Sequence, residues 1–148
     1  MGCDIHSHIE VKISGKWHYF SPVDMWRSYI TFAKMANVRN WPDGPVPISE
    51  PKGLPDDISF MTKFHSDIYG DDGHSHSWLG CDELIELLKF FNDEGLKKPW
   101  GSHLEDDEFK LDDFGVWLFG SSISSFKKYP GGYPEGLEDV RMVFWFEN

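Results

Sequence analysis

Both ends of the chain alternate between apolar and polar residues, as a half-buried β-strand does. Residues 5–13 carry the first alternation, and residues 16–20 read as a returning strand after the Ser14-Gly15 pair. A short turn of this kind predicts an N-terminal hairpin. Residues 140–147 alternate in the same way, so we expect a final strand that is buried on at least one face.

Three internal stretches repeat their apolar residues at helical spacing. The Ser21-Pro22 pair offers a cap and a first-turn proline, which predicts a first helix over residues 24–36. Residues 56–68 predict a short second helix that ends at Gly70, and residues 82–92 predict a third.

The remaining segments are expected to be loops or have no clear type. The proline-rich residues 40–55 predict a packed loop, and residues 70–80 predict a polar one. Residues 105–108 are acidic and expected to be solvated, and the pattern of residues 111–126 favours neither helix nor strand. We therefore predict one α+β domain over residues 1–148, with an antiparallel sheet that joins the two terminal strands and about three helices.

Composition and net charge argue against several classes of protein. The chain has 148 residues, 40% of them hydrophobic and 16% aromatic, which is too apolar for a disordered protein. The net charge of −11 argues against binding to duplex nucleic acid. No apolar run approaches the roughly 20 residues of a membrane-spanning helix, and the first residues lack the pattern of a secretion signal. We expect a cytoplasmic protein without a membrane partner.

Histidine placement is the most informative chemical signal. Random placement of the seven histidines gives about 0.3 His-x-His pairs, whereas two such pairs occur. The pairs, with their nearest acids, are His6 and His8 with Asp4 and Glu10, and His74 and His76 with Asp71 and Asp72.

The first pair predicts half of a metal site. Strand residues two apart share a face at a Cα separation of about 6.6 Å, so His6 and His8 can converge on one ion. With Asp4 they form the D-x-H-x-H run of amidohydrolase-type metal hydrolases, a local resemblance because those enzymes are far longer barrels. His74 and His76, or carboxylates, would complete the site. Zinc is the ion expected first, with manganese and iron as alternatives.

Other residues are candidates for catalysis and ligand contact. A metal with an open position lowers the pKa of its bound water to about 7, and Glu10 or Asp72 is then the candidate general base. Arg141 is the candidate for stabilising a phosphate or carboxylate, with a surface salt bridge as its alternative role. Trp41 and Trp78 are the tryptophans assigned to ligand contact, with core packing as the alternative.

Structural roles remain open for the same residues. The first histidine pair can occupy the wet face of a strand, and the acid and serine side chains around the second pair can cap the following helix. Cys3 and Cys81 are expected to be buried thiols, with a closed structural Cys/His metal site as the alternative.

Five segments carry a family resemblance: MGCDIH (1–6), RSYITFAKMANVRN (27–40), EPKGLPDDIS (50–59), DGHSHSWL (72–79) and DVRMVFWFEN (139–148). They resemble a family of small proteins encoded by bacteriophages and some bacteria, over nearly the whole chain. The resemblance implies expression in the cytoplasm of a bacterial host cell. Small phage proteins without structural roles often counter host defences, so it also implies a defence signal as the target.

Three hypotheses follow. The first is a metal-dependent hydrolase of a small anionic substrate, a nucleotide or cyclic-nucleotide defence signal being the best candidate. The second is a binding module without chemistry, such as a homo-oligomeric sponge for that nucleotide. The third is an acidic inhibitor that mimics nucleic acid and blocks a host protein.

Overall fold

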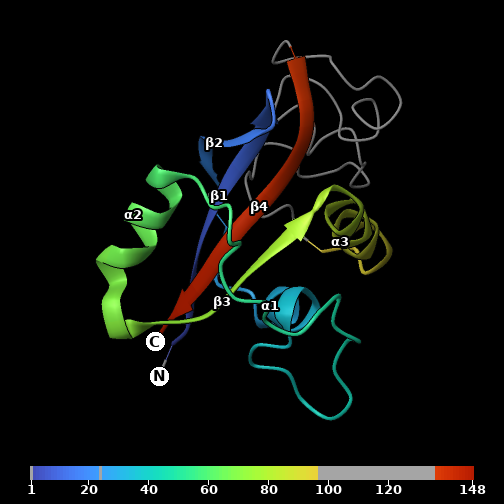
Figure 1. Cartoon of the computed structure of the whole chain (residues 1–148). Helices are drawn as coiled ribbons and strands as arrows, with labels where there is room; N and C mark the ends of the chain where they lie inside the picture. The colour runs from blue at the N-terminus through green and yellow to red at the C-terminus, as the bar shows by residue number, and fades with distance from the viewer. Residues whose placement is uncertain (1, 24, 97–135) are drawn as a thin grey trace.

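The computed structural model describes residues 2–23, 25–96 and 136–148. Its centre is an antiparallel sheet of four strands in the order β2-β1-β4-β3. The strands are β1 (Asp4–Ile13), β2 (Lys16–Val23), β3 (Gly73–Gly80) and β4 (Leu137–Glu147). The terminal strands β1 and β4 are neighbours in the middle of the sheet (Figure 1), as the alternation at both ends of the chain predicts.

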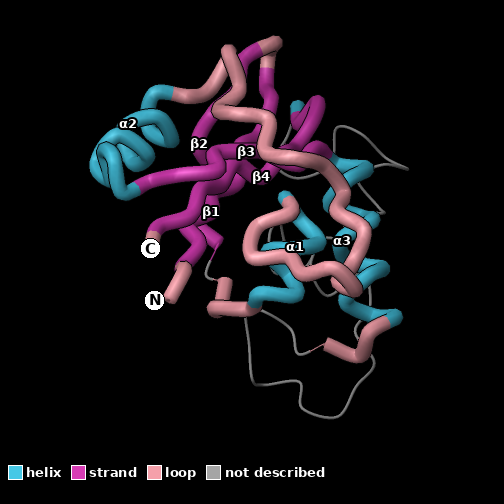
Figure 2. The backbone as a smooth tube through the Cα atoms, turned by 90° about the horizontal axis from the view of Figure 1, so that it is seen from below, coloured by secondary structure: helices cyan, strands magenta, loops and turns pink. Residues whose placement is uncertain are grey.

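Helices cover both faces of this sheet. They are α1 (Tyr29–Ala36), α2 (Phe60–Tyr69), the short 3₁₀ helix η1 (Gly70–Asp72) and α3 (Cys81–Asp93). In Figures 1 and 2, α2 lies on one side of the sheet and α1 and α3 lie on the other. The predicted α+β fold is confirmed. No helix in the part of the chain that the structure describes has the length and apolar character needed to cross a membrane.

The apolar core lies between the sheet and the α1 and α3 side. Met142, Phe144 and Phe146 are fully buried, and the Phe146 ring packs edge-on against Phe32 of α1 at a centroid distance of 5.0 Å. The intervening residue Trp145 is also fully buried, on the α2 side. Strand β4 is therefore covered on both faces, and burying each ring contributes about 2 to 3 kcal/mol.

The first helix begins later than the sequence predicts. Ser21 and Pro22 belong to β2, where Pro22 pairs with His8 of β1, and α1 begins at Tyr29 after the N-cap Ser28. Strand β2 is an edge strand, where a proline can sit without breaking a ladder of hydrogen bonds. Sheet pairing therefore overrides the local capping signal.

The prediction of a polar loop over residues 70–80 is wrong, because residues 73–80 form β3. His74 pairs with Phe146 and Ser77 with Phe144, so two residues of β3 stand opposite Trp145 alone. This is a β-bulge, and Ser75 within it has a left-handed φ of 52°.

The predicted second and third helices are confirmed, with shifted ends. Ser59 caps α2 by accepting a hydrogen bond from the Thr62 backbone. The predicted solvated segment 105–108 and the ambiguous segment 111–126 lie outside the described residues.

Helix α2 has an unusual orientation, since its apolar residues face solvent. The side chains of Phe60, Met61, Phe64 and Ile68 are all exposed. The side that packs towards the sheet carries Thr62, His65, Ser66 and Tyr69. A polar interface between a helix and a sheet adds little hydrophobic stabilisation, which favours a role beyond packing.

Candidate functional site

Four imidazoles gather with one tryptophan between the sheet and α2. The Trp145 ring centroid lies 5.1 Å from His8, 6.1 Å from His6 and 6.1 Å from His76. His65 of α2 stacks on His8 at 4.9 Å. We call these five residues the histidine cluster. Two tyrosines border it, Tyr19 beside His8 and Tyr69 beside His6.

Backbone geometry brings the histidines together. His6 and His8 are two apart on β1 and share the face towards α2, as the sequence predicts. The bulge at Ser75 places His76 on this face but leaves His74 on the other, where its ring stacks on Phe146. Only three of the four paired histidines therefore meet, and His65 joins them from α2.

Burial controls the charge of His8. Its side chain lies in the buried interior, with 8% of the residue exposed, and burial, together with smaller effects of His65 and His6, lowers its pKa to about 4. The ring is therefore neutral at pH 7. Its Nδ1 has no hydrogen-bond partner among the described residues, and neither has Nε1 of Trp145. Unsatisfied buried polar atoms mark places where a water, an ion or a ligand can bind.

His6 belongs to a hydrogen-bonded chain of three side chains. Its Nε2 lies 2.8 Å from Glu147 Oε2, and its Nδ1 lies 3.0 Å from the Tyr69 hydroxyl. An ionised carboxylate only accepts, so Nε2 of His6 donates to Glu147, and Nδ1 of the neutral ring accepts from Tyr69. A phenol, an imidazole and an orienting carboxylate in this order have the arrangement of an acid–base unit. Burial raises the pKa of Tyr69, and the Glu147 charge raises it further.

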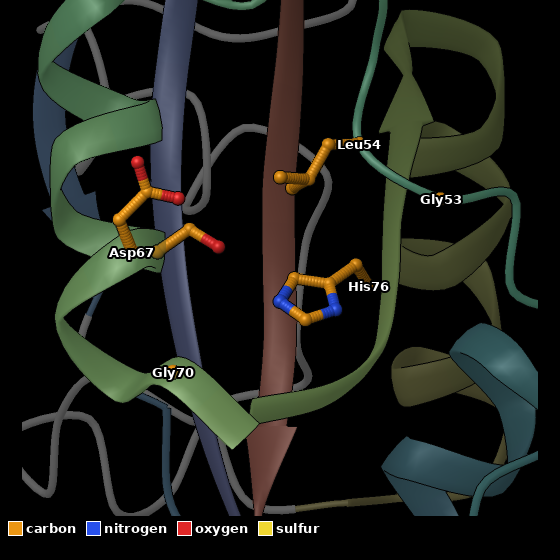
Figure 3. A pocket seen from close by; sticks show the side chains of 6 residues that line it. Gly53, Leu54, Asp67, Gly70 and His76 are labelled. Carbon is orange, nitrogen blue, oxygen red and sulfur yellow. The ribbon is translucent and has the colours of Figure 1, made fainter. Parts of the chain in front are cut away.

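A pocket of about 430 Å³ opens beside the cluster, between α2 and β3 (Figure 3). It has His76 on the β3 side and Asp67 on the α2 side. Burial lowers the pKa of His76, and the neighbouring His74 lowers it further. The remaining lining residues are Gly53, Leu54, Ser66 and Gly70. The volume lies within the range of small-molecule sites, and His76 forms part of the pocket wall.

Two residues predicted for catalysis are bound to each other. Arg141 Nη2 lies 2.7 Å from Glu10 Oε1, and both side chains are almost completely buried. The second oxygen of Glu10 accepts a hydrogen bond from the Ser59 backbone at 2.8 Å, and Arg141 also donates to Asp57 at 2.7 Å. Arg141 therefore forms a salt bridge, which was its alternative role, but this salt bridge lies in the interior and not on the surface.

The other predicted ligand residues are dispersed. Asp4 accepts two hydrogen bonds of 2.8 Å from Arg27, and this contact lowers its pKa. Asp72 is exposed on η1, and His74 lies on the opposite face of the sheet. Within residues 2–23, 25–96 and 136–148, no three His, Cys, Asp or Glu side chains are close enough to form a metal-binding group.

The tryptophans assigned to ligand contact lie in different surroundings. Trp41 is 45% exposed in the proline-rich loop. The Lys52 ammonium lies 4.0 Å from the centroid of the Trp78 ring, and the Arg141 guanidinium carbon lies 6.0 Å from the same centroid. Cys3 and Cys81 are buried in the apolar core, as expected for structural thiols.

Sequence reasoning missed four members of the site: His65, Tyr69, Trp145 and Glu147. His65 and Tyr69 are four residues apart in the predicted second helix and therefore share one face of it. That spacing was a usable signal.

Comparison of the chain with models of protein families, with curated proteins and with solved structures found no match.

Proposed function

We propose that the histidine cluster binds a divalent transition metal and that the protein is a hydrolase of a small anionic substrate. The observation that carries the proposal is His8. Metal ligation requires a neutral imidazole with an available nitrogen, and His8 is a buried ring with a pKa of about 4 and an unpartnered Nδ1.

The surroundings favour a cation. Asp67, which is paired with Lys63, lines the pocket with His76, and Glu147 is bound to His6, so carboxylates border the imidazoles. Carboxylates at short range attract a divalent ion. A bound ion would also offset the repulsion between an anionic substrate and a protein with a net charge of −11.

We assign His8, His65 and His76 to the ion, because both nitrogens of His6 are engaged by Glu147 and Tyr69. Imidazole donors suit zinc, and also iron or copper. Side chains would have to shift on binding, since no three of these donors are yet close enough together in the described part of the chain. The ion would supply a water of lowered pKa for hydrolysis.

Proton transfer is assigned to Tyr69, His6 and Glu147. The raised pKa keeps the Tyr69 phenol protonated at neutral pH, so it can donate a proton to a leaving oxygen and does not act as the nucleophile. The proton that the attacking water gives up returns through solvent to Tyr69, and Glu147 holds the His6 imidazole in the tautomer whose Nδ1 accepts from the phenol and orients it. Nucleotides and cyclic nucleotides are the substrates that we propose.

The first test is metal content. Untagged protein purified without chelator, then titrated with Zn²⁺, should hold a stoichiometric ion by elemental mass spectrometry. The His8→Ala/His65→Ala variant should lose it, whereas His18→Ala, which changes an exposed histidine on β2, should keep it. A parent protein that takes up no ion, or a double variant with unchanged content, would rule out the site.

The second test is turnover of cyclic nucleotides and other phosphodiesters by the metal-loaded protein. Tyr69→Phe should lower kcat roughly 100-fold while the metal content stays unchanged. If the nucleotide is instead bound and recovered intact after denaturation, the protein is a binding module and the hydrolase proposal fails.

A further inference from the structure

A second pocket lies on the side of β3 away from the histidine cluster. Its volume is about 390 Å³, within the range of small-molecule sites. It is formed by the segment after α1, the loop that precedes α2, the start of β3 and the residue that follows β4. Its lining includes Asn37, Arg39, Glu50, His74, Ser75 and Asn148.

Backbone strain is concentrated at this pocket. Four residues other than glycine have a left-handed φ in the described ranges, and three of them line the pocket: Asn37, Arg39 and Ser75. Asn37 ends α1, where this conformation is common. Arg39 at 55° lies in the turn after α1, and Ser75 at 52° lies in the bulge of β3. Strained residues of this kind persist where the surrounding structure holds them, and they gather at functional sites.

Two side chains of the pocket, Arg39 and His74, can donate hydrogen bonds to a ligand. Arg39 makes no ion pair with any residue that the structure describes, and donates one hydrogen bond of 3.1 Å to the Asn148 side-chain oxygen. His74 Nδ1 lies 3.0 Å from the Ser75 hydroxyl. When Ser75 donates to Nδ1, the ring proton resides on Nε2, which is buried without a partner in the described residues.

The acid of the pocket, Glu50, accepts one hydrogen bond of 2.8 Å from the Asn37 side chain and keeps its charge, which the Arg39 guanidinium offsets. A guanidinium and an imidazole N–H without anionic partners complement the oxygen atoms of a phosphate or carboxylate. We propose that this pocket is a second ligand site, which binds the oxyanion group of a small molecule through Arg39 and His74. It does not depend on the metal proposal.

The test is calorimetric titration of the full chain with inorganic phosphate and with acetate at constant ionic strength. Saturable binding of either anion is expected, and which anion binds identifies the group. Arg39→Gln should weaken binding roughly tenfold or more, the effect of losing one charged hydrogen bond. Lys16→Gln is the matched control, because it removes one exposed positive charge in the N-terminal hairpin and should leave affinity unchanged.

Ser75→Gly provides a second variant that is expected to fold, since glycine adopts a φ of 52° freely. It removes the hydroxyl beside His74 and should also weaken binding. His8→Ala should bind the anion as the parent does, which separates this site from the histidine cluster. The proposal is overturned if neither anion binds saturably, or if Arg39→Gln and Ser75→Gly both bind as tightly as the parent.

Discussion

The buried ion pair between Glu10 and Arg141 gives the strongest prediction about stability. Glu10 is fully buried and Arg141 is 4% exposed, and their closest atoms are 2.7 Å apart. Arg141→Met keeps the length and apolar character of the side chain but removes the charge. The Glu10 carboxylate then loses its partner in the interior and keeps only the Ser59 backbone donor.

The expected loss is large because a single charge remains in a medium that solvates it poorly. Breaking a buried pair by removing one partner costs about 3 to 5 kcal/mol of the free energy of unfolding, out of roughly 5 to 15 kcal/mol for a typical domain. Asp57, the second partner of Arg141, has a side chain that is 66% exposed. Asp57→Asn should therefore cost less than about 1 kcal/mol.

Urea unfolding followed by circular dichroism measures these differences. The double variant Glu10→Leu/Arg141→Met removes both charges and should recover most of the loss, since apolar side chains often replace a buried pair without cost. Arg27→Met is the control, because it breaks the half-exposed contact with Asp4 and should leave the unfolding midpoint close to that of the parent. The reasoning fails if Arg141→Met costs less than about 1 kcal/mol, or if the double variant is less stable than either single variant.

Two further predictions concern pH and the hairpin turn. The folded pKa of His8, about 4, is below the 6.5 of a free imidazole, so between these values the unfolded chain binds a proton that the folded chain does not. Stability from this residue is therefore complete above pH 6.5 and falls by up to about 3 kcal/mol as the pH drops to 4; His8→Gln should flatten this decline in urea titrations, and an unchanged slope would contradict the assignment. In the turn between β1 and β2, Ser14 and Gly15 have φ values of 51° and 75°, which suit an Asn-Gly sequence. Ser14→Asn should raise the free energy of unfolding by about 0.5 kcal/mol and Ser14→Val should lower it, so equal stability of the two variants in the same assay would refute the turn assignment.

The sheet was predictable where alternation and turn chemistry agree. Strand β1 alternates, and the Ser14-Gly15 pair specifies the tight turn to β2. Strand β3 was not predictable in this way, because its glycine, serine and histidine residues have the composition of a loop. Pairing with β4 supplies the hydrogen bonds that make it a strand. Non-local pairing of this kind cannot be inferred from the segment itself.

Helix α2 is predicted correctly from the sequence, but its buried face is not. The spacing of Met61, Phe64 and Ile68 predicts a helix at this place, and α2 is found there. The same spacing would place these residues against a core, yet they are exposed and His65 and Tyr69 face the sheet. Periodicity fixes which residues share a face, but not which face is buried. The histidine cluster exists because the polar face of α2 is the buried one.

The two His-x-His pairs have identical spacing and different outcomes. On the regular strand β1, His6 and His8 share a face, so both enter the cluster. On β3, the bulge at Ser75 divides the pair between the two faces of the sheet. His76 joins the cluster, and His74 lines the pocket that holds Arg39. One backbone conformation at Ser75 thus separates the proposed cation site from the proposed anion site, and a histidine count alone could not distinguish them.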